Sequence, residues 1–317
     1  MAKQRTRLYF VSDLHGSGKC FRKFLNGGPI YEADELVLGG DLAGKAIQAI
    51  IRAPGGRFTF NFRGTAYDLE DGEELRGVEQ LIADHGYYPY RADPGELADR
   101  EAAGSLDDLF LALITERLEQ WLELADERLR PKGIPIYWML GNDDPPELAP
   151  LLDDAPWGTH CEGRDVQVGG HEMISWGYAN TTPWHTFREM TDDELRAVYE
   201  RLAGELSDPG HAIFNLHPPP YDTGLDEAPV LDENLTVQTA AGQAKMSAVG
   251  SHAVREILER VQPLLGLHGH IHESAGFRKI GRTVAINPGS DYGTGVLNGV
   301  LVTLEPQKVK AYQFVRG

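Results

Sequence analysis

Five short apolar runs, each stopping at turn-forming or metal-binding side chains, constrain the fold of this chain most strongly. They cover residues 8–11, 36–38, 134–140, 212–216 and 264–267. Apolar runs of this length bounded by turn formers are typical of buried strands. Open α/β sheets bind their ligands at the carboxyl ends of such strands. A single polar end can be ordinary turn chemistry, but five of them predict an α/β fold with one shared site.

The composition is that of an ordinary globular protein, with 317 residues, 41% hydrophobic and 25% charged. We therefore expect one large domain over residues 1–317. No apolar run approaches the roughly 18 residues that a membrane span needs. The run at residues 8–11 is also too brief for a signal-peptide core. We expect a cytoplasmic location, in which Cys20 and Cys161 stay reduced thiols.

The formal net charge of -18 bears on the partners of the chain. Neutralisation of backbone phosphates is the main source of affinity for nucleic acids, and an acidic surface opposes it. The charge therefore disfavours long DNA or RNA as a partner. Bound metal ions would supply local positive charge, so the acidic surface makes a nuclease a less favoured function but does not exclude it.

The segment 52–130 is expected to be a peripheral insertion within the domain. Phe58, Phe60 and Phe62 alternate with polar residues near several glycines, which predicts an exposed hairpin. Apolar residues three or four apart over 106–129 predict a helix, and we interpret them as core packing. Thr191 and Glu194 match a capping box at the start of another helix. Residues 251–261 are expected to be helical, and 299–315 to form a closing hairpin.

Seven side chains after the predicted strands could bind metal ions. They are Asp13, His15, Asp41, Asn142, His217, His270 and His272. Such a mixture of carboxylates, an amide and imidazoles suits Mn, Fe, Zn, Ni or Co better than Ca, which prefers oxygen. The sequence has only two cysteines, too few for the cysteine cluster of a structural zinc centre.

Taken in order, five motifs resemble those of the calcineurin-like metallophosphoesterases. They are Asp13-Leu14-His15, Gly40-Asp41, Gly141-Asn142-Asp143-Asp144, His217 and Gly269-His270-Ile271-His272. The stretch Asn287-Pro288-Gly289-Ser290 is also similar to a segment that follows the last motif in some bacterial and archaeal members. The resemblance implies an α/β fold built as a four-layer α/β/β/α sandwich with two mixed β-sheets.

The resemblance also implies a site with two divalent transition-metal ions. The first ion would be held by Asp13, His15, Asp41 and His272. The second would be held by Asp41, Asn142, His217 and His270. The implied activity is that of a metal-dependent phosphoesterase, in which a hydroxide bridging the two ions attacks the phosphorus of a small phosphorylated substrate.

One position departs from the family pattern. Most active members have a histidine directly after the motif asparagine, where it contacts phosphate and assists the leaving group; this chain has Asp143. An aspartate, with an ordinary pKa of about 3.9, is a poor proton donor near neutral pH. Its charge would also repel a monoester dianion more than a diester monoanion. With Asn142 and Asp143 as candidate catalytic residues, we expect slow hydrolysis that favours phosphodiesters.

Two other interpretations stay open. One is a scaffold or binding protein that keeps the fold with little or no turnover, and the other is a nuclease. Intact metal-binding side chains at all seven matching positions weigh against the scaffold. Among the other histidines, His268 is expected to support the site or to have no role, and His185 beside Trp184 is a candidate substrate contact on a loop.

Overall fold

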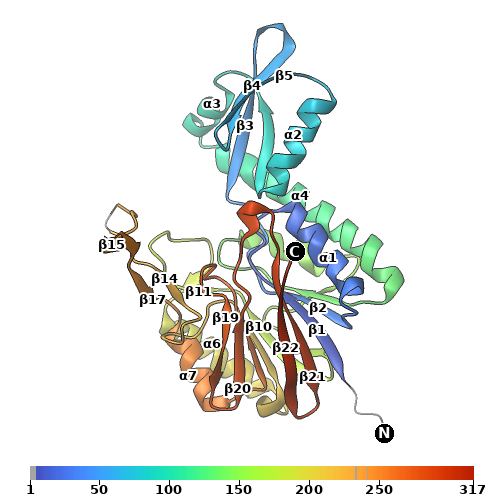
Figure 1. Ribbon diagram of the computed structural model, residues 1–317, viewed down its shortest axis with the longest axis vertical. Helices are drawn as coiled ribbons and strands as arrows, with labels where there is room; N and C mark the ends of the chain where they lie inside the picture. The colour runs from blue at the N-terminus through green and yellow to red at the C-terminus, as the bar shows by residue number, and fades with distance from the viewer. Residues whose placement is uncertain (1–4, 233, 241) are drawn as a thin grey trace.

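Two six-stranded mixed sheets form the body of the protein (Figure 1). The computed structural model describes residues 5–232, 234–240 and 242–317. The first sheet has β1, β2, β7 and β8 parallel, with β21 and β22 antiparallel at one side. Its strands, in spatial order, are β22 (Lys308–Arg316), β21 (Asn298–Glu305), β1 (Thr6–Val11), β2 (Glu35–Leu38), β7 (Ile136–Trp138) and β8 (Thr159–His160).

The second sheet has a parallel centre and two antiparallel edge strands. Its strands, in spatial order, are β19 (Gly276–Ile280), β20 (Thr283–Asn287), β18 (Leu265–Leu267), β13 (Ile213–Leu216), β10 (His171–Trp176) and β9 (Val166–Val168). All five apolar runs of the sequence therefore contain a buried strand of one of these two sheets, which confirms a mixed α/β protein.

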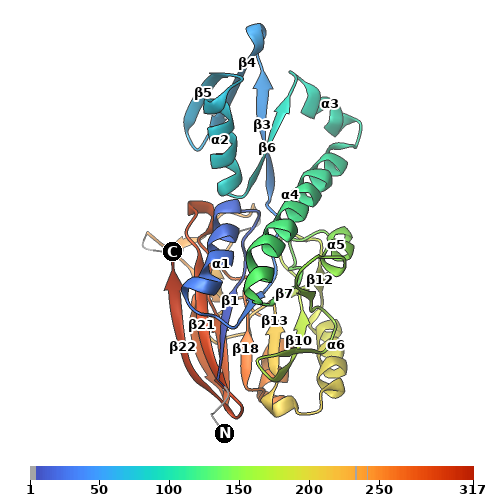
Figure 2. The same ribbon diagram turned by 90° about the vertical axis from the view of Figure 1, so that its right-hand side faces the viewer.

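Side chains of β1 alternate between two separate cores. Tyr9 and Val11 pack with helices α1 and α4, whereas Leu8 and Phe10 pack against residues of the second sheet. A third core joins the second sheet to α6 and α7. Figure 2 shows α1 and α4 beside the first sheet and α6 beside the second. The body helices are α1 (Gly18–Ile30), α4 (Leu106–Leu129), α5 (Ala149–Asp153), α6 (Asp192–Glu205) and α7 (His252–Val261).

Three of the sequence predictions hold at the level of single elements. Helix α4 spans the residues predicted for it, and its Trp121 stacks on Phe21 of α1 with ring centroids 4.2 Å apart. Thr191 and Glu194 form the expected capping box at the start of α6. The tail forms the β21–β22 hairpin. Cys20 and Cys161 are both free and buried.

A third sheet projects from one end of the body, and we call it, together with α2 and α3, the lobe (Figure 1). It has the order β5-β4-β3-β6 and its own small core. Its elements are β3 (Ala46–Arg52), β4 (Arg57–Phe62), β5 (Thr65–Glu70), α2 (Glu73–Asp84), β6 (Tyr87–Ala92) and α3 (Glu96–Ala102). The lobe therefore begins with a strand that precedes the expected segment 52–130.

The expected exposed hairpin of the lobe is wrong in one respect. The hairpin exists as β4 and β5, but Phe58, Phe60 and Phe62 are only 1%, 8% and 4% exposed. The reason is that one face of the sheet packs on α2, so the alternating aromatic residues fill a core. Alternation alone shows that a strand has two faces, and the structure shows which face is covered.

The remaining elements are short. The small strand pairs are β11 (Ala179–Asn180) with β12 (Glu189–Met190), β14 (Glu227–Pro229) with β17 (Met246–Ala248), and β15 (Thr239–Ala240) with β16 (Gln243–Ala244). The 3-10 turns are η1 (Pro54–Gly56), η2 (Arg130–Lys132), η3 (Pro146–Leu148), η4 (Pro209–His211) and η5 (Tyr292–Thr294). Within the described residues, no helix combines the length and the apolar character that crossing a membrane requires.

Candidate metal centre

The loops after five parallel strands meet at one end of the body, near the base of the lobe. These strands are β1, β2 and β7 of the first sheet and β13 and β18 of the second. The loops bring six of the seven predicted metal-binding side chains into two clusters, and the amide of the seventh, Asn142, bonds Asp143 beside them. Five of the seven, all but His270 and His272, are more than nine-tenths buried, which is unusual for charged and polar groups and calls for a compensating partner.

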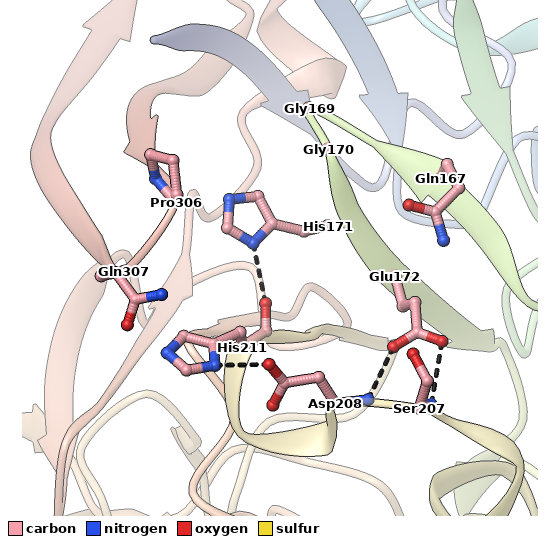
Figure 3. A pocket seen from close by; sticks show the side chains of 10 residues that line it. All are labelled: Gln167, Gly169, Gly170, His171, Glu172, Ser207, Asp208, His211, Pro306 and Gln307. Carbon is pink, nitrogen blue, oxygen red and sulfur yellow. Dashed lines mark hydrogen bonds and ion pairs between the residues drawn. The ribbon is translucent and has the colours of Figure 1, made fainter. Parts of the chain in front are cut away.

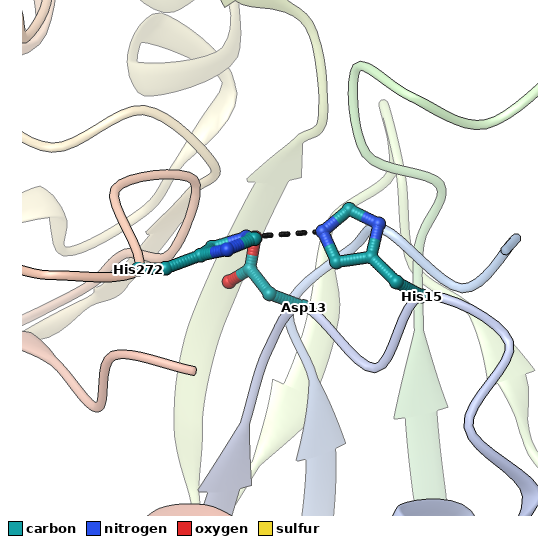
Figure 4. Close-up of side chains that lie close together, drawn as sticks. All are labelled: Asp13, His15 and His272. Atoms are coloured by element: carbon teal, nitrogen blue, oxygen red, sulfur yellow. Dashed lines mark hydrogen bonds and ion pairs between the residues drawn. The ribbon is translucent and has the colours of Figure 1, made fainter. Parts of the chain in front are cut away.

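Asp13, His15 and His272 form the first cluster (Figure 4). His15 Nε2 lies 3.0 Å from His272 Nε2, and His272 Nε2 lies 3.4 Å from Asp13 Oδ1. Ligand atoms bound to one transition-metal ion at about 2.0–2.2 Å lie roughly 3–3.5 Å from one another. The spacing of the first cluster therefore fits three ligands of one ion.

Asp41, His217 and His270 form the second cluster. His217 Nε2 lies 3.4 Å from Asp41 Oδ2, and the same oxygen lies 3.5 Å from His15 Nε2 of the first cluster. Asp41 thus stands between the two clusters, where its carboxylate could contact an ion in each. This is the arrangement that the family resemblance implies for Asp41.

Strained backbone occurs at four of the seven residues. Asp13, His15, Asp41 and His270 have φ values of 59°, 41°, 54° and 66°. Residues other than glycine rarely adopt this left-handed region, and such strain is concentrated at functional sites. The tight turns that follow the strands are therefore maintained at a cost, and their effect is to aim these side chains at a common point.

Two glycines allow the loops to approach the clusters. A Cβ at Gly141 would lie 2.1 Å from Asp41 Oδ1, and one at Gly269 would lie 2.3 Å from Asp13 Oδ2. Neither carboxylate could keep its place beside a larger residue. The glycines of these two motifs are thus required by close packing around the acidic groups.

Hydrogen bonds fix the direction in which the ligand atoms point. His217 Nδ1 bonds the carbonyl oxygen of Gly39 at 2.8 Å, so Nε2 faces the clusters. The backbone N–H of His270 donates to both carboxylate oxygens of Asp13 at 3.0 and 3.1 Å. Such outer contacts are what orients metal ligands in proteins.

Buried polar atoms without a hydrogen-bond partner provide a test of whether these residues fit metal ions. Asn142 Oδ1 is buried and has no such partner, and the buried His217 Nε2 faces only carboxylate oxygens, the nearer of them Asp41 Oδ2 at 3.4 Å. Leaving such atoms unpaired costs about 1–3 kcal/mol each, unless a ligand takes them up. A cation is the ligand that an amide oxygen and an imidazole nitrogen share, so the donor set could hold metal ions.

The electrostatics of the clusters favour added positive charge. Burial acts to raise the pKa of Asp13, but the facing His272 and His217 outweigh it and hold that pKa at about 2. Burial acts to lower the pKa of His217, but Asp41 and Asp13 raise it to about 9. The carboxylates therefore attract a proton onto His217, and a cation binding there would replace that proton.

Asp143 forms a third group of possible metal-binding side chains with His15 and Asp41, and it also contacts a lysine. Its Oδ2 is 2.6 Å from Lys45 Nζ and 3.7 Å from His15 Nδ1. Lys45 was not predicted from the sequence, because it lies 98 residues from Asp143 and no local pattern links the two. The neighbouring Asp144 holds the loops together, because its carboxylate accepts hydrogen bonds from the backbone N–H groups of Leu42, Ala43 and Gly141.

Residues of the loop between β11 and β12 were also missed. Thr186 Oγ1 accepts a hydrogen bond from Asn142 Nδ2 at 3.0 Å, and Glu189 accepts from Thr186. His185 is exposed in this loop and belongs to neither cluster. His268 is buried, and its Nδ1 bonds Leu216 O at 2.8 Å, which fits a supporting role.

A cavity of about 290 Å³ lies elsewhere on the molecule (Figure 3). It is lined by residues around His171, His211 and Pro306, and none of the seven predicted metal-binding residues belongs to it. Both histidines of the cavity already have partners: His171 Nδ1 bonds the backbone oxygen of His211, and His211 Nδ1 pairs with the Asp208 carboxylate. The described residues of the cavity therefore lack the grouped, unengaged side chains that the two clusters have.

Known proteins support the fold of the chain. No family model matches it. Uncharacterized protein MJ1162 of Methanocaldococcus jannaschii is 26% identical over 175 residues, which cover 55% of this chain and 69% of that protein. The crystal structure of TT1561 of Thermus thermophilus aligns over 95% of this chain and 98% of its own, with 14% identity and a TM-score of 0.53.

A structure described as a novel archaeal phosphodiesterase also aligns. It covers 98% of this chain and 99% of its own, at 11% identity and a TM-score of 0.38. The similarity to TT1561 therefore supports the fold, and the residues of the two clusters are the evidence for the chemistry.

Proposed function

We propose that this protein is a metal-dependent phosphoesterase with two divalent transition-metal ions, one at each cluster. The observation that carries the proposal is the position of Asp41, whose Oδ2 lies 3.5 Å from His15 Nε2 and 3.4 Å from His217 Nε2. A carboxylate between two sets of imidazoles is what a binuclear centre requires. We also propose that the two sheets and their covering helices form the four-layer sandwich of the calcineurin-like metallophosphoesterases.

The chain's own residues would perform three tasks in the reaction. The first and second clusters would hold the ions, which when bound supply Lewis acidity toward phosphate and lower the pKa of a water molecule. Asn142, with its unpaired Oδ1, would complete the second set of ligands. Lys45, half-exposed at 51% beside Asp143, would present a cation to the phosphate at the open side of the centre.

The charge of the centre favours phosphodiesters. Two divalent cations and the carboxylates of Asp13 and Asp41 sum to about +2 by simple addition, and the Lys45 ammonium offsets the Asp143 carboxylate beside it. A diester monoanion would leave the centre near about +1 by the same addition, whereas the second charge of a monoester dianion would meet the remaining repulsion from Asp143. Burial and the nearby Asp41 raise the pKa of Asp143, but its Oδ2 pairs with Lys45 Nζ at 2.6 Å as a carboxylate, which makes it a poor proton donor. We therefore propose a small phosphodiester with a good leaving group as the substrate class.

A scaffold without turnover is the second candidate, and the same experiment separates the two. The purified protein is loaded with Mn²⁺ and assayed for hydrolysis of bis(p-nitrophenyl) phosphate. We expect metal-dependent turnover that chelation abolishes and that Asp41→Ala removes. Asp208→Ala, in a surface pair with His211, is the matched control and should keep full activity. Bound metal without any hydrolysis would favour the scaffold instead.

A further inference from the structure

The side-chain amide of Asn142 is held by the loop between β11 and β12. Asn142 Nδ2 donates to Thr186 Oγ1 at 3.0 Å and to Asp143 Oδ1 at 3.2 Å, and the backbone N–H of Arg188 donates to Asn142 O at 3.1 Å. Thr186 lies 44 residues from Asn142 along the chain. The loop therefore touches a candidate metal ligand directly, although it contributes no ligand to either cluster.

The carboxylate of Glu189 accepts hydrogen bonds from two threonines of the same loop, Thr182 and Thr186. It accepts from Thr182 N at 3.1 Å and from Thr182 Oγ1 at 2.6 Å. It also accepts from Thr186 N and Thr186 Oγ1, both at 2.8 Å. Three of these four bonds end on Oε1. Because a carboxylate can only accept, both threonine hydroxyls must direct their protons at Glu189.

The proton count fixes the orientation of the Asn142 amide. A threonine hydroxyl has one proton and two lone pairs. Thr186 gives its proton to Glu189, so only lone pairs are left to face Asn142, and a lone pair can bind only the NH₂ side of the amide. Oδ1 must then point the other way, where it is buried and has no hydrogen-bond partner. A network of this kind is what distinguishes the oxygen from the nitrogen of an amide.

We propose that Thr186 and Glu189 form a relay that positions the Asn142 oxygen as a ligand of the ion at the second cluster. The relay rests on the proposed binuclear centre. A neutral amide oxygen is a weaker ligand than a carboxylate, and if the amide turned over it would present an NH₂ group to the cation. The relay opposes that rotation, together with Asp143 Oδ1, which accepts from the same NH₂ group at 3.2 Å. Thr186 and Glu189 are therefore positioning residues that touch neither ion nor substrate.

Thr182 offers a matched control for Thr186. Both hydroxyls donate to Oε1 of Glu189, at 2.6 and 2.8 Å, but only Thr186 accepts from Asn142. Thr186→Val keeps the shape and removes the acceptor. Loss of such an outer contact typically costs about 10–100-fold in metal affinity. Thr182→Val removes a bond to the same carboxylate without touching the amide, so it should change metal affinity by less than the roughly tenfold lower end of that range.

The test is a calorimetric titration of the metal-free full chain with Mn²⁺ alone. We expect two bound ions in the wild type, and in Thr186→Val a Kd for one of them raised by about 10–100-fold. Thr186→Ser, which keeps the hydroxyl, should restore the wild-type value. Equal affinities in Thr186→Val and Thr182→Val would overturn the relay while leaving the binuclear centre intact, whereas a wild type that binds no Mn²⁺ would overturn both.

A second comparison separates orientation from a general loosening of the loop. Asn142→Asp presents an oxygen on either side of the group, so its orientation no longer matters. In that background Thr186→Val should weaken Mn²⁺ binding by much less than about tenfold, because the relay has nothing to orient. A loss as large as in the Asn142 protein would mean that Thr186 only supports the fold of the loop, and the relay would be wrong.

Discussion

The ion pair of Lys45 and Asp143 leads to the sharpest prediction about substrate charge. Lys45 Nζ lies 2.6 Å from Asp143 Oδ2, and the side chains are 51% and 15% exposed. Lys45→Met keeps the length of the side chain but removes its charge. The Asp143 carboxylate is then unneutralised beside His15, and an anionic phosphate ester must approach it. We expect kcat/KM to fall for every anionic substrate.

The size of the effect depends on the charge of the substrate. One unit charge about 6 Å from a phosphate corresponds to about 0.7 kcal/mol in water and about 2.8 kcal/mol at an effective dielectric constant of about 20. A half-exposed Lys45 next to a mostly covered Asp143 places the effect between these limits, at about 1.4 kcal/mol. This is roughly tenfold in kcat/KM for a diester monoanion. A monoester dianion should lose twice the free energy, or roughly a hundredfold.

The assay compares bis(p-nitrophenyl) phosphate with p-nitrophenyl phosphate, using Mn²⁺-loaded protein. The double variant Lys45→Met with Asp143→Asn restores a neutral pair, so it should recover most of the lost rate. Equal losses on the two substrates would show that the charge of the substrate does not set the effect. A double variant that loses as much rate as Lys45→Met alone would contradict the role of the Asp143 charge.

Three further predictions concern the centre and its loops. Asp41→Ala should weaken both metal sites at once, which elemental analysis would show; full metal content and activity would contradict its shared role. Gly141→Ala places a Cβ 2.1 Å from Asp41 Oδ1, so we expect lower metal affinity and about 1–3 kcal/mol lower unfolding free energy in urea titrations. Asp143→His should raise turnover on poor leaving groups by up to roughly 10²–10⁴-fold; unchanged leaving-group sensitivity with intact metal content would contradict a missing general acid.

Much of the local structure could be predicted from the sequence, because its causes are local. The apolar spacing over α4 and the capping box of Thr191 and Glu194 depend on residues a few positions apart. The strand ends that hold the clusters were also predictable. Short buried strands followed by turn residues have a strong pattern, and parallel strands bring their carboxyl ends to one edge.

Contacts between distant segments could not be predicted in the same way. Lys45 neutralises Asp143 across 98 residues, and this removes much of the repulsion expected from Asp143 alone. Thr186 reaches Asn142 from a loop with no periodic pattern. The lobe begins at Ala46, because β3 pairs with β6, which follows the β4–β5 hairpin and α2 along the chain, and strand pairing over that distance leaves no mark in the local sequence.

Anomalous diffraction from a crystal of the full chain loaded with Mn²⁺ is the most direct test of the binuclear centre. We expect two strong peaks. One should lie within bonding distance of Asp13, His15 and His272, the other within bonding distance of Asn142, His217 and His270, and Asp41 should contact both. A single peak, or a peak held by side chains of the lobe, would contradict the binuclear centre.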